Sequence, residues 1–235
     1  MDSIEGIPHE GKSGVGVLDK SVAVLSFLAT GGAASLAEVV AGTGLARPTA
    51  YRLLSALEAH HLVSRRDGRY GLGLRLLGWG NVAAGGVVER TRPALERLRD
   101  ATGESTQLYV REGESRVCVA SVERTGGGLR DAVPVGAMLP LGRGSGGTVL
   151  LAWDQERGGS SLELTRVQTR GWAESVAERE EGVASVSAPV FWADGRVRAA
   201  VSASGPISRL GKHPGERLAK SVLAAAREIE SALAE

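Results

Sequence analysis

The chain has 235 residues, which is long enough for two domains with separate cores, and 43% of its residues are hydrophobic, an ordinary share for a globular protein. No apolar stretch approaches the length needed to cross a bilayer. Residues 1–14 are polar and lack the apolar segment of a secretion signal, so the sequence predicts a disordered tail and a cytoplasmic protein. The single cysteine excludes an internal disulfide and a cysteine-rich zinc site. We expect no metal, no other cofactor and no membrane partner.

The net charge of +1 conceals an uneven distribution along the chain. Residues 46–75 carry six arginines against two carboxylates, a net charge of +4 with the histidines neutral. Residues 86–235 carry 20 basic and 20 acidic side chains and are therefore neutral. The positive segment favours an anionic partner, and a nucleic acid is the obvious one.

The N-terminal third predicts three helices. Apolar residues at helical spacing form a first helix that packs under the next two: Leu18, Val22, Leu25 and Leu28. Ser35 followed by Glu38 is a capping box, which begins a second helix that Gly42 and Gly44 end. A third helix runs from about Ala46 to about His60, and its buried face consists of Ala50, Leu53, Leu54 and Leu57.

The other face of the third helix combines arginine, hydroxyl and aromatic side chains, weighted to its N-terminus. Such a face suits the major groove of DNA. Pro48 is tolerated because it lies in the first turn. The candidate DNA-binding residues of this helix are Arg47, Pro48, Thr49, Tyr51, Arg52 and Ser55.

A hairpin follows, because apolar residues alternate on both sides of the dipeptide Asp67-Gly68. Arg65, Arg66 and Arg69 cluster at its tip, where they can reach phosphates or an adjacent minor groove. Helix, turn, helix and basic hairpin together predict a winged helix-turn-helix domain over residues 15–73. A protein-interaction module with the same topology remains the alternative.

The rest of the chain predicts a linker helix over residues 74–87 and an α+β effector-binding domain, similar in plan to GAF folds, over residues 88–235. Its expected helices are Arg90–Ala101, Thr148–Trp153, Leu162–Arg170 and a terminal helix from Pro214. Its expected strands are Thr106–Arg111, Arg116–Val122, Arg130–Val135, Val183–Trp192 and Arg196–Ser204.

Two features of this domain suggest a polar pocket. The glycines of residues 142–147 formally spell G-x-G-x-x-G, but the preceding strand and the βαβ unit of a dinucleotide site are missing. The loop instead opens a helix N-terminus, which attracts a carboxylate or phosphate; a plain loop is the alternative. Ser202 and Ser204 share one strand face, and Ser185 and Ser187 repeat the pattern, although serine pairs also occur at edges and turns.

Catalysis has little support, because none of the four histidines lies in the expected sheet and no Ser-His-Asp or Cys-His set can be assembled. Cys118 lies in an apolar run, which predicts a buried, inert thiol rather than a redox sensor. We therefore expect no enzymatic activity. An enzyme fused to a nucleic-acid module is the weaker alternative.

Several sequence words now point to a family. They are GLARPTAYRLLSALEAHHLV and RYGLGLRLLGWG in the first domain, and TGESTQLYVREG, VPVGAMLPL, RGWAESVAEREEGVASVSAPV and AAVSASGPISRL in the second. From about Gly16 to Leu233 the chain resembles the IclR-type transcriptional regulators, and among them the actinobacterial regulators of amino-acid metabolism, particularly leucine biosynthesis. The resemblance implies dimers through the DNA-binding domains, often paired into tetramers, and a small organic or aromatic acid as effector.

The resemblance also implies which residues bind the effector: Leu139, Ser145, Gly146, Ser175, Val183, Ser185, Ser202 and Ser204. Two departures leave the identity of the effector open. The segment Asp154–Thr169 is shorter than in many members, and Ser175 and Trp172 stand where members often have an acidic residue and a tyrosine. The residues favour a regulator that binds double-stranded operator DNA and a small carboxylate with a short aliphatic part, with no arginine required for its capture.

Overall fold

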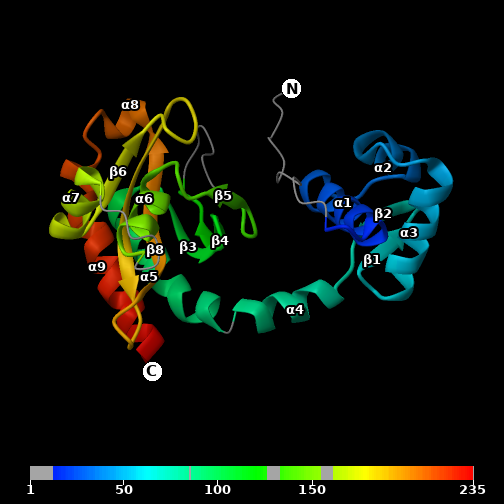
Figure 1. Ribbon diagram of the computed structural model, residues 1–235, viewed down its shortest axis with the longest axis horizontal. Helices are drawn as coiled ribbons and strands as arrows, with labels where there is room; N and C mark the ends of the chain where they lie inside the picture. Colours follow the sequence, from blue (N-terminus) through cyan, green and yellow to red (C-terminus); the bar gives the residue numbers. More distant parts are fainter. Residues whose placement is uncertain (1–12, 85, 126–132, 155–160, 235) are drawn as a thin grey trace. The chain divides into compact units, whose positions relative to one another are not determined.

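The computed structural model describes residues 13–84, 86–125, 133–154 and 161–234, and it divides into two compact units, Met1–Gly85 and Gly86–Glu235 (Figure 1). Most of the expected disordered tail over residues 1–14 lies outside the described residues. Within the described residues no helix is long and apolar enough to cross a membrane.

The first unit contains the helix-turn-helix that the sequence predicts. Helix α1 (Gly16–Gly31) precedes α2 (Leu36–Thr43) and α3 (Arg47–Ala59). The capping box is confirmed, because Ser35 Oγ accepts the Glu38 N–H at 3.3 Å and the Glu38 carboxylate accepts the Ser35 N–H at 2.7 Å. Helix α2 ends where Gly44 takes the left-handed conformation, with φ of 68°.

The core of this unit corrects the expected face of the first helix. Val24 and Leu28 of α1 are buried against Val39, Leu54 and other residues of α2, α3 and the hairpin. Leu18 and Val22 are instead 52% and 37% exposed. Since α1 carries apolar residues on more than one face, its spacing alone could not tell which face the other helices would cover.

The predicted wing is also present. Strands β1 (Val63–Arg66) and β2 (Arg69–Leu72) pair antiparallel, with Arg66 opposite Arg69. The two turn residues Asp67 and Gly68 have φ of 50° and 75°, the left-handed pair that a two-residue hairpin with matched twist requires. Helix α4 (Arg75–Ala84) then ends the unit.

The second unit is a six-stranded antiparallel sheet with helices on both faces. The strand order is β5-β4-β3-β8-β7-β6. The strands are β3 (Ser105–Glu112), β4 (Ser115–Val122), β5 (Met138–Pro140), β6 (Ala173–Val176), β7 (Val183–Phe191) and β8 (Val197–Pro206). The helices are α5 (Val87–Thr102), α6 (Ser145–Ala152), α7 (Leu162–Arg170), α8 (Ile207–Leu210) and α9 (Gly215–Ala234).

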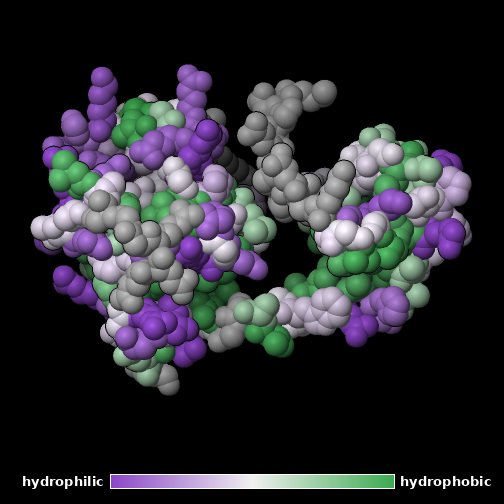
Figure 2. Space-filling view, in the orientation of Figure 1, coloured by the Kyte–Doolittle hydropathy of each residue, from purple (hydrophilic) through white to green (hydrophobic). Residues whose placement is uncertain are grey.

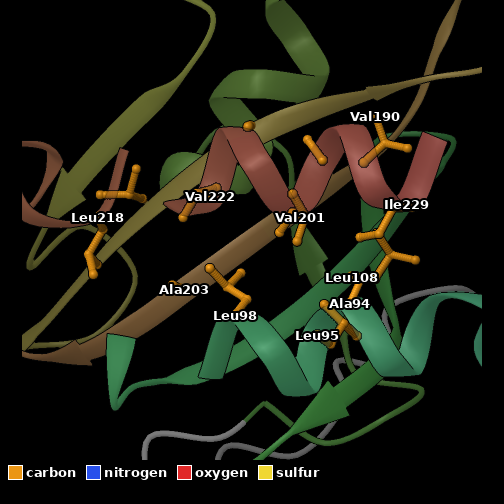
Figure 3. Close-up of a cluster of buried hydrophobic side chains, with 14 of the residues drawn as sticks. Ala94, Leu95, Leu98, Leu108, Val190, Val201, Ala203, Leu218, Val222 and Ile229 are labelled. Atoms are coloured by element: carbon orange, nitrogen blue, oxygen red, sulfur yellow. The ribbon is translucent and has the colours of Figure 1, made fainter. Parts of the chain in front are cut away.

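Strand alternation gives the two faces of the sheet different chemistry. On one face, α5 and α9 pack on alternate residues of the central strands, as Figure 3 shows for Leu95 and Ile229 against Leu108 and Val201. On the opposite face, which α6 contacts, β8 presents Ser202 and Ser204. The fold therefore builds one apolar core under the first face, and on the other face a polar floor beside a second apolar cluster that includes Cys118, Val149 and Ala200.

Several predicted boundaries in this unit were wrong or incomplete. The expected strand Arg130–Val135 is absent over Val133–Val135, and residues 130–132 lie outside the described part. Strands β5 and β6 were missed, because they are short edge strands of three and four residues without a readable alternation. Helix α6 begins at Ser145 rather than Thr148, because its N-cap is Gly144, which has φ of 79°, and not the last glycine of the loop.

Candidate nucleic-acid interface and ligand pocket

The candidate DNA-binding residues of α3 form the outer face of that helix. Ala50, Leu54 and Leu57 are buried beneath it. All but one of the six candidates are exposed, and Thr49 is half-buried: Arg47, Pro48, Thr49, Tyr51, Arg52 and Ser55. This face therefore offers two guanidinium groups and a tyrosine that is 51% exposed.

The three wing arginines differ in how far their guanidinium groups are bound to the rest of the protein. Arg66 is exposed, and the Arg65 guanidinium lies 5.2 Å from the centre of the Tyr70 ring. Arg69 differs from the expectation of a free side chain at the tip, because it donates to the Ala33 carbonyl at 2.8 Å and pairs with Glu38 at 3.1 Å. Arg69 thus links the wing to the start of α2, which leaves Arg65 and Arg66 as the better candidates for phosphate contact.

The second unit has a small pocket where the N-terminus of α6 meets the polar face of the sheet. Seven of the eight residues that the family resemblance implies line this pocket: Ser145, Gly146, Ser175, Val183, Ser185, Ser202 and Ser204. Leu139 is the exception, because it lies on the edge strand β5, half-buried against the core around Cys118. The structure adds Tyr109, Arg116, Gly144 and Arg179.

Four serines of the pocket, Ser145, Ser175, Ser185 and Ser202, are joined through Ser187 in one hydrogen-bonded chain. Ser145 Oγ lies 2.7 Å from Ser185 Oγ and 2.8 Å from Ser187 Oγ. Ser185 continues to Ser175 at 3.0 Å, and Ser187 donates to Ser202 at 2.9 Å. The sheet register explains the chain, since Ser175 pairs with Ser185 and Ser187 pairs with Ser202 across neighbouring strands.

Proton counting gives this chain a direction. A hydroxyl carries one proton. Ser202 donates to the Val186 carbonyl and Ser187 donates to Ser202, so Ser145 must donate to Ser187. It follows that Ser185 donates to Ser145 and Ser175 donates to Ser185. Each proton in the chain is therefore already used inside the protein.

Arg116 is the main residue of the pocket that the sequence interpretation missed. It lies on β4, is 2% exposed, and its Nη1 donates to the carbonyls of Pro140 and Arg143. Burial is the largest cause that lowers the pKa of its guanidinium from the usual value, and the nearby Arg179 lowers it further. The sequence interpretation required no arginine for capture of the effector and named none in the pocket, whereas the structure places Arg116 and Arg179 in its wall. The signal was present, because Arg116 falls in phase with the buried Cys118 and Ala120.

The glycine-rich loop wraps around this arginine. A Cβ on Gly147 would lie 2.7 Å from Arg116 Nη1 and 2.1 Å from the Leu141 carbonyl oxygen. A Cβ on Gly144 would lie 3.3 Å from Nη2, and one on Gly146 would lie 3.6 Å from Nε. Gly147 is therefore required for the close approach of the guanidinium and Gly144 is tight against it, so packing accounts for these two glycines without a dinucleotide site.

Cys118 matches the expectation of a buried thiol. It is fully buried, and its Sγ donates to the carbonyls of Ala120 and Val133. Burial raises the pKa of Cys118 to about 12. Since the thiolate is the reactive form, this thiol is a poor nucleophile at neutral pH.

Comparisons with known proteins agree with this architecture. The family model of the IclR helix-turn-helix domain matches residues 17–67, and that of the bacterial transcriptional regulator IclR C-terminal domain matches residues 81–162 and 157–231. The chain is 31% identical to the glycerol operon regulatory protein of Streptomyces griseus, over 82% of this chain and 85% of that protein.

Solved structures share the whole fold. A putative transcriptional regulator from Rhodococcus sp. RHA1 is 26% identical with a TM-score of 0.74, and the match covers 94% of this chain and 98% of that one. An IclR homolog from Microbacterium hydrocarbonoxydans, complexed with 4-hydroxybenzoate, is 22% identical with a TM-score of 0.76 over 92% and 98% of the two chains. With both family models matched along nearly the whole chain, this protein is a member of the IclR family of DNA-binding transcriptional regulators.

Proposed function

We propose that this protein binds a specific operator through α3 and the wing, and that a small carboxylate in the pocket of the second unit modulates that binding. The carrying observation is that seven of the eight residues implied for effector binding line one pocket. These residues come from α6, β6, β7 and β8, which are far apart in the sequence. A shared pocket is a stronger basis for the proposal than any one motif.

The pocket supports a small ligand with an anionic group. Its lining combines hydroxyl groups, two guanidinium groups and the short apolar side chain of Val183. The residues in its wall favour an amino acid or 2-oxo acid, and a link to amino-acid metabolism, particularly leucine biosynthesis, stays part of the proposal. The matched relative is named for a glycerol operon and a solved neighbour holds 4-hydroxybenzoate, so polyols and aromatic acids belong in the test.

A dimer is part of the proposal, because the first unit exposes apolar side chains on two helices. On α1 and just before it these are Val15, Val17, Leu18 and Val22; on α4 and just before it they are Leu74, Leu77, Trp79 and Val82. Figure 2 shows apolar side chains along the α4 segment. Two copies that cover these residues would place two copies of α3 on the half-sites of a roughly palindromic operator.

The experiment begins with genome-wide mapping of bound DNA, which supplies the operator for affinity measurements. Arg52→Ala should weaken operator binding by about 1–3 kcal/mol if Arg52 contacts a base edge. Arg65→Ala and Arg66→Ala should each weaken binding to all DNA sequences. Each should also reduce the slope of log K against the logarithm of the salt concentration by about one unit. Arg166→Ala, an exposed arginine of α7, is the matched control.

Effector binding is tested on the same protein by calorimetry with amino acids, 2-oxo acids, glycerol and 4-hydroxybenzoate. At least one carboxylate should bind and change the affinity for the operator. The DNA assignment fails if the Arg52, Arg65 and Arg66 variants keep wild-type operator affinity. The effector assignment fails separately if no carboxylate binds.

A further inference from the structure

Arg116 is a buried cation that forms no ion pair with a carboxylate of the described residues. Its side chain is 2% exposed, and the ion pairs of the described part of the chain include none to this guanidinium. Its Nε is buried and has no hydrogen-bond partner. Burying an unpaired charge is costly, so a fold that keeps one at the wall of a pocket gains stability when an anion arrives.

The serine hydroxyl groups of the pocket have no free proton to donate to an anion, so Arg116 is the candidate donor. The protons of Ser145, Ser175 and Ser185 are committed within the serine chain, and Ser202 donates its proton to the Val186 carbonyl. Ser204 donates its proton to Gln107 Oε1 at 3.2 Å. These serines therefore present lone pairs to a ligand unless a bond within the protein breaks, whereas a carboxylate needs donors.

A carboxylate of the protein already binds the N-terminus of α6 beside the pocket. The Gly144 N–H, at the N-cap of α6, donates to Glu178 Oε2 at 3.0 Å. Glu178 is exposed and lies on the turn between β6 and β7, next to Arg179, which lines the pocket. The negative charge of Glu178 acts on Arg116 without an ion pair between them.

We propose that Arg116 captures the carboxylate of the effector, and that this carboxylate displaces Glu178 from the first turn of α6. The proposal rests on the regulator function proposed above. The incoming carboxylate accepts from Arg116 Nε and takes over the Gly144 N–H, while Glu178 returns to water. Arg116 then gains the direct ion pair that it lacks, and the helix N-terminus keeps an anion throughout.

The two residues must then respond in opposite directions. Arg116→Met, which keeps an unbranched apolar stem but removes the charged guanidinium, should weaken binding of a carboxylate on the order of tenfold to a hundredfold. Glu178→Gln should strengthen binding about threefold or more, because a neutral amide competes less well for the Gly144 N–H. Glu181→Gln, which removes a charge from an exposed residue of the same turn, should change little.

The probes are chosen to separate charge capture from a damaged pocket. Calorimetry on the full-length protein compares lactate with lactamide, and pyruvate with pyruvamide, alongside L-leucine. In each pair only the acid carries a charge. If Arg116 captures a carboxylate, Arg116→Met weakens binding of the acid and leaves that of the amide nearly unchanged. A merely structural role would weaken binding of both.

Each outcome decides the matter. Equal dissociation constants for the acids in the wild type, Arg116→Met and Glu178→Gln would overturn this proposal and leave the effector function standing. If no carboxylate binds the wild-type protein, both fail. If Arg116→Met does not fold, the comparison of Glu178→Gln with Glu181→Gln decides: stronger binding in the first alone supports the proposal, and equal binding overturns it.

Discussion

At the scale of single residues, the pocket depends on how each polar group is satisfied. Ser202 and Ser204 are 2% and 4% exposed and bond to neighbouring groups of the protein. The sequence interpretation assigned both to effector binding, and the structure shows that their protons are already in use. Their first role is therefore to satisfy a buried polar floor, which an apolar replacement would leave with unpaired groups.

Ser202→Ala combined with Ser204→Ala should accordingly reduce the free energy of unfolding of the second unit. The change leaves the Ser187 hydroxyl without its acceptor and Gln107 Oε1 without its donor, each worth about 1–3 kcal/mol when buried. Urea unfolding followed by circular dichroism measures the loss, with the exposed Ser208→Ala as control. A large fall in effector affinity at unchanged stability would instead show that these hydroxyls contact the ligand directly.

At the scale of elements, the wing and α2 are joined by one acidic residue. Glu38 closes the capping box on Ser35 and pairs with Arg69 of β2, which also donates to the Ala33 carbonyl. The helix start and the hairpin therefore share a charge network. Hydrogen bonds from the backbone and side chain of Ser35, followed by the positive charge of Arg69, lower the pKa of Glu38.

This lowered pKa predicts how stability depends on pH. A carboxyl whose pKa is lower in the folded state stabilises the fold above its unfolded pKa of about 4.5, and this contribution is lost as the pH falls through the folded pKa. Glu38→Ala should therefore lower the Tm at pH 7, and the difference from wild type should shrink below pH 4.5. Thermal unfolding across this pH range measures the difference in Tm between Glu38→Ala and the wild type, with Glu58→Ala as the control. A difference that stayed constant as the pH fell would contradict the network.

At the scale of the whole molecule, the two units have separate cores. One buried cluster belongs to α1–α3 and the wing, and two others belong to the sheet with its helices. No buried cluster of the described residues draws on both units. Each unit should therefore fold by its own contacts, with residues 74–87 as the connection between them.

A polypeptide of residues 86–235 should be folded, should associate with itself and should bind no operator DNA. The reason is that it keeps both clusters of the sheet unit and carries no net charge, while it lacks α3 and the wing. Circular dichroism, sedimentation and an operator-binding assay give the three answers. A polypeptide that is unfolded in isolation would argue against a boundary near Gly86.

The sequence alone determined the elements whose signals are local. The capping box at Ser35, the Asp67-Gly68 turn and the alternation of β8 each depend on residues a few positions apart, and each was predicted. Short edge strands such as β5 were not predicted, because three residues are too few to show an alternation of apolar and polar side chains. The face of α1 that is buried also escaped, since its apolar residues lie on more than one side.

Only the tertiary structure decided the chemistry of the pocket. The serines could be grouped from their strand spacing, but their donors and acceptors depend on partners up to 97 residues away. Arg116 lies on β4, and the loop that encloses it begins more than 25 residues later in the chain. A sequence pattern records which face of a strand a residue takes. It does not record which distant backbone segment will pack against that face. The packing of the glycine-rich loop against Arg116 is what forms the candidate anion site.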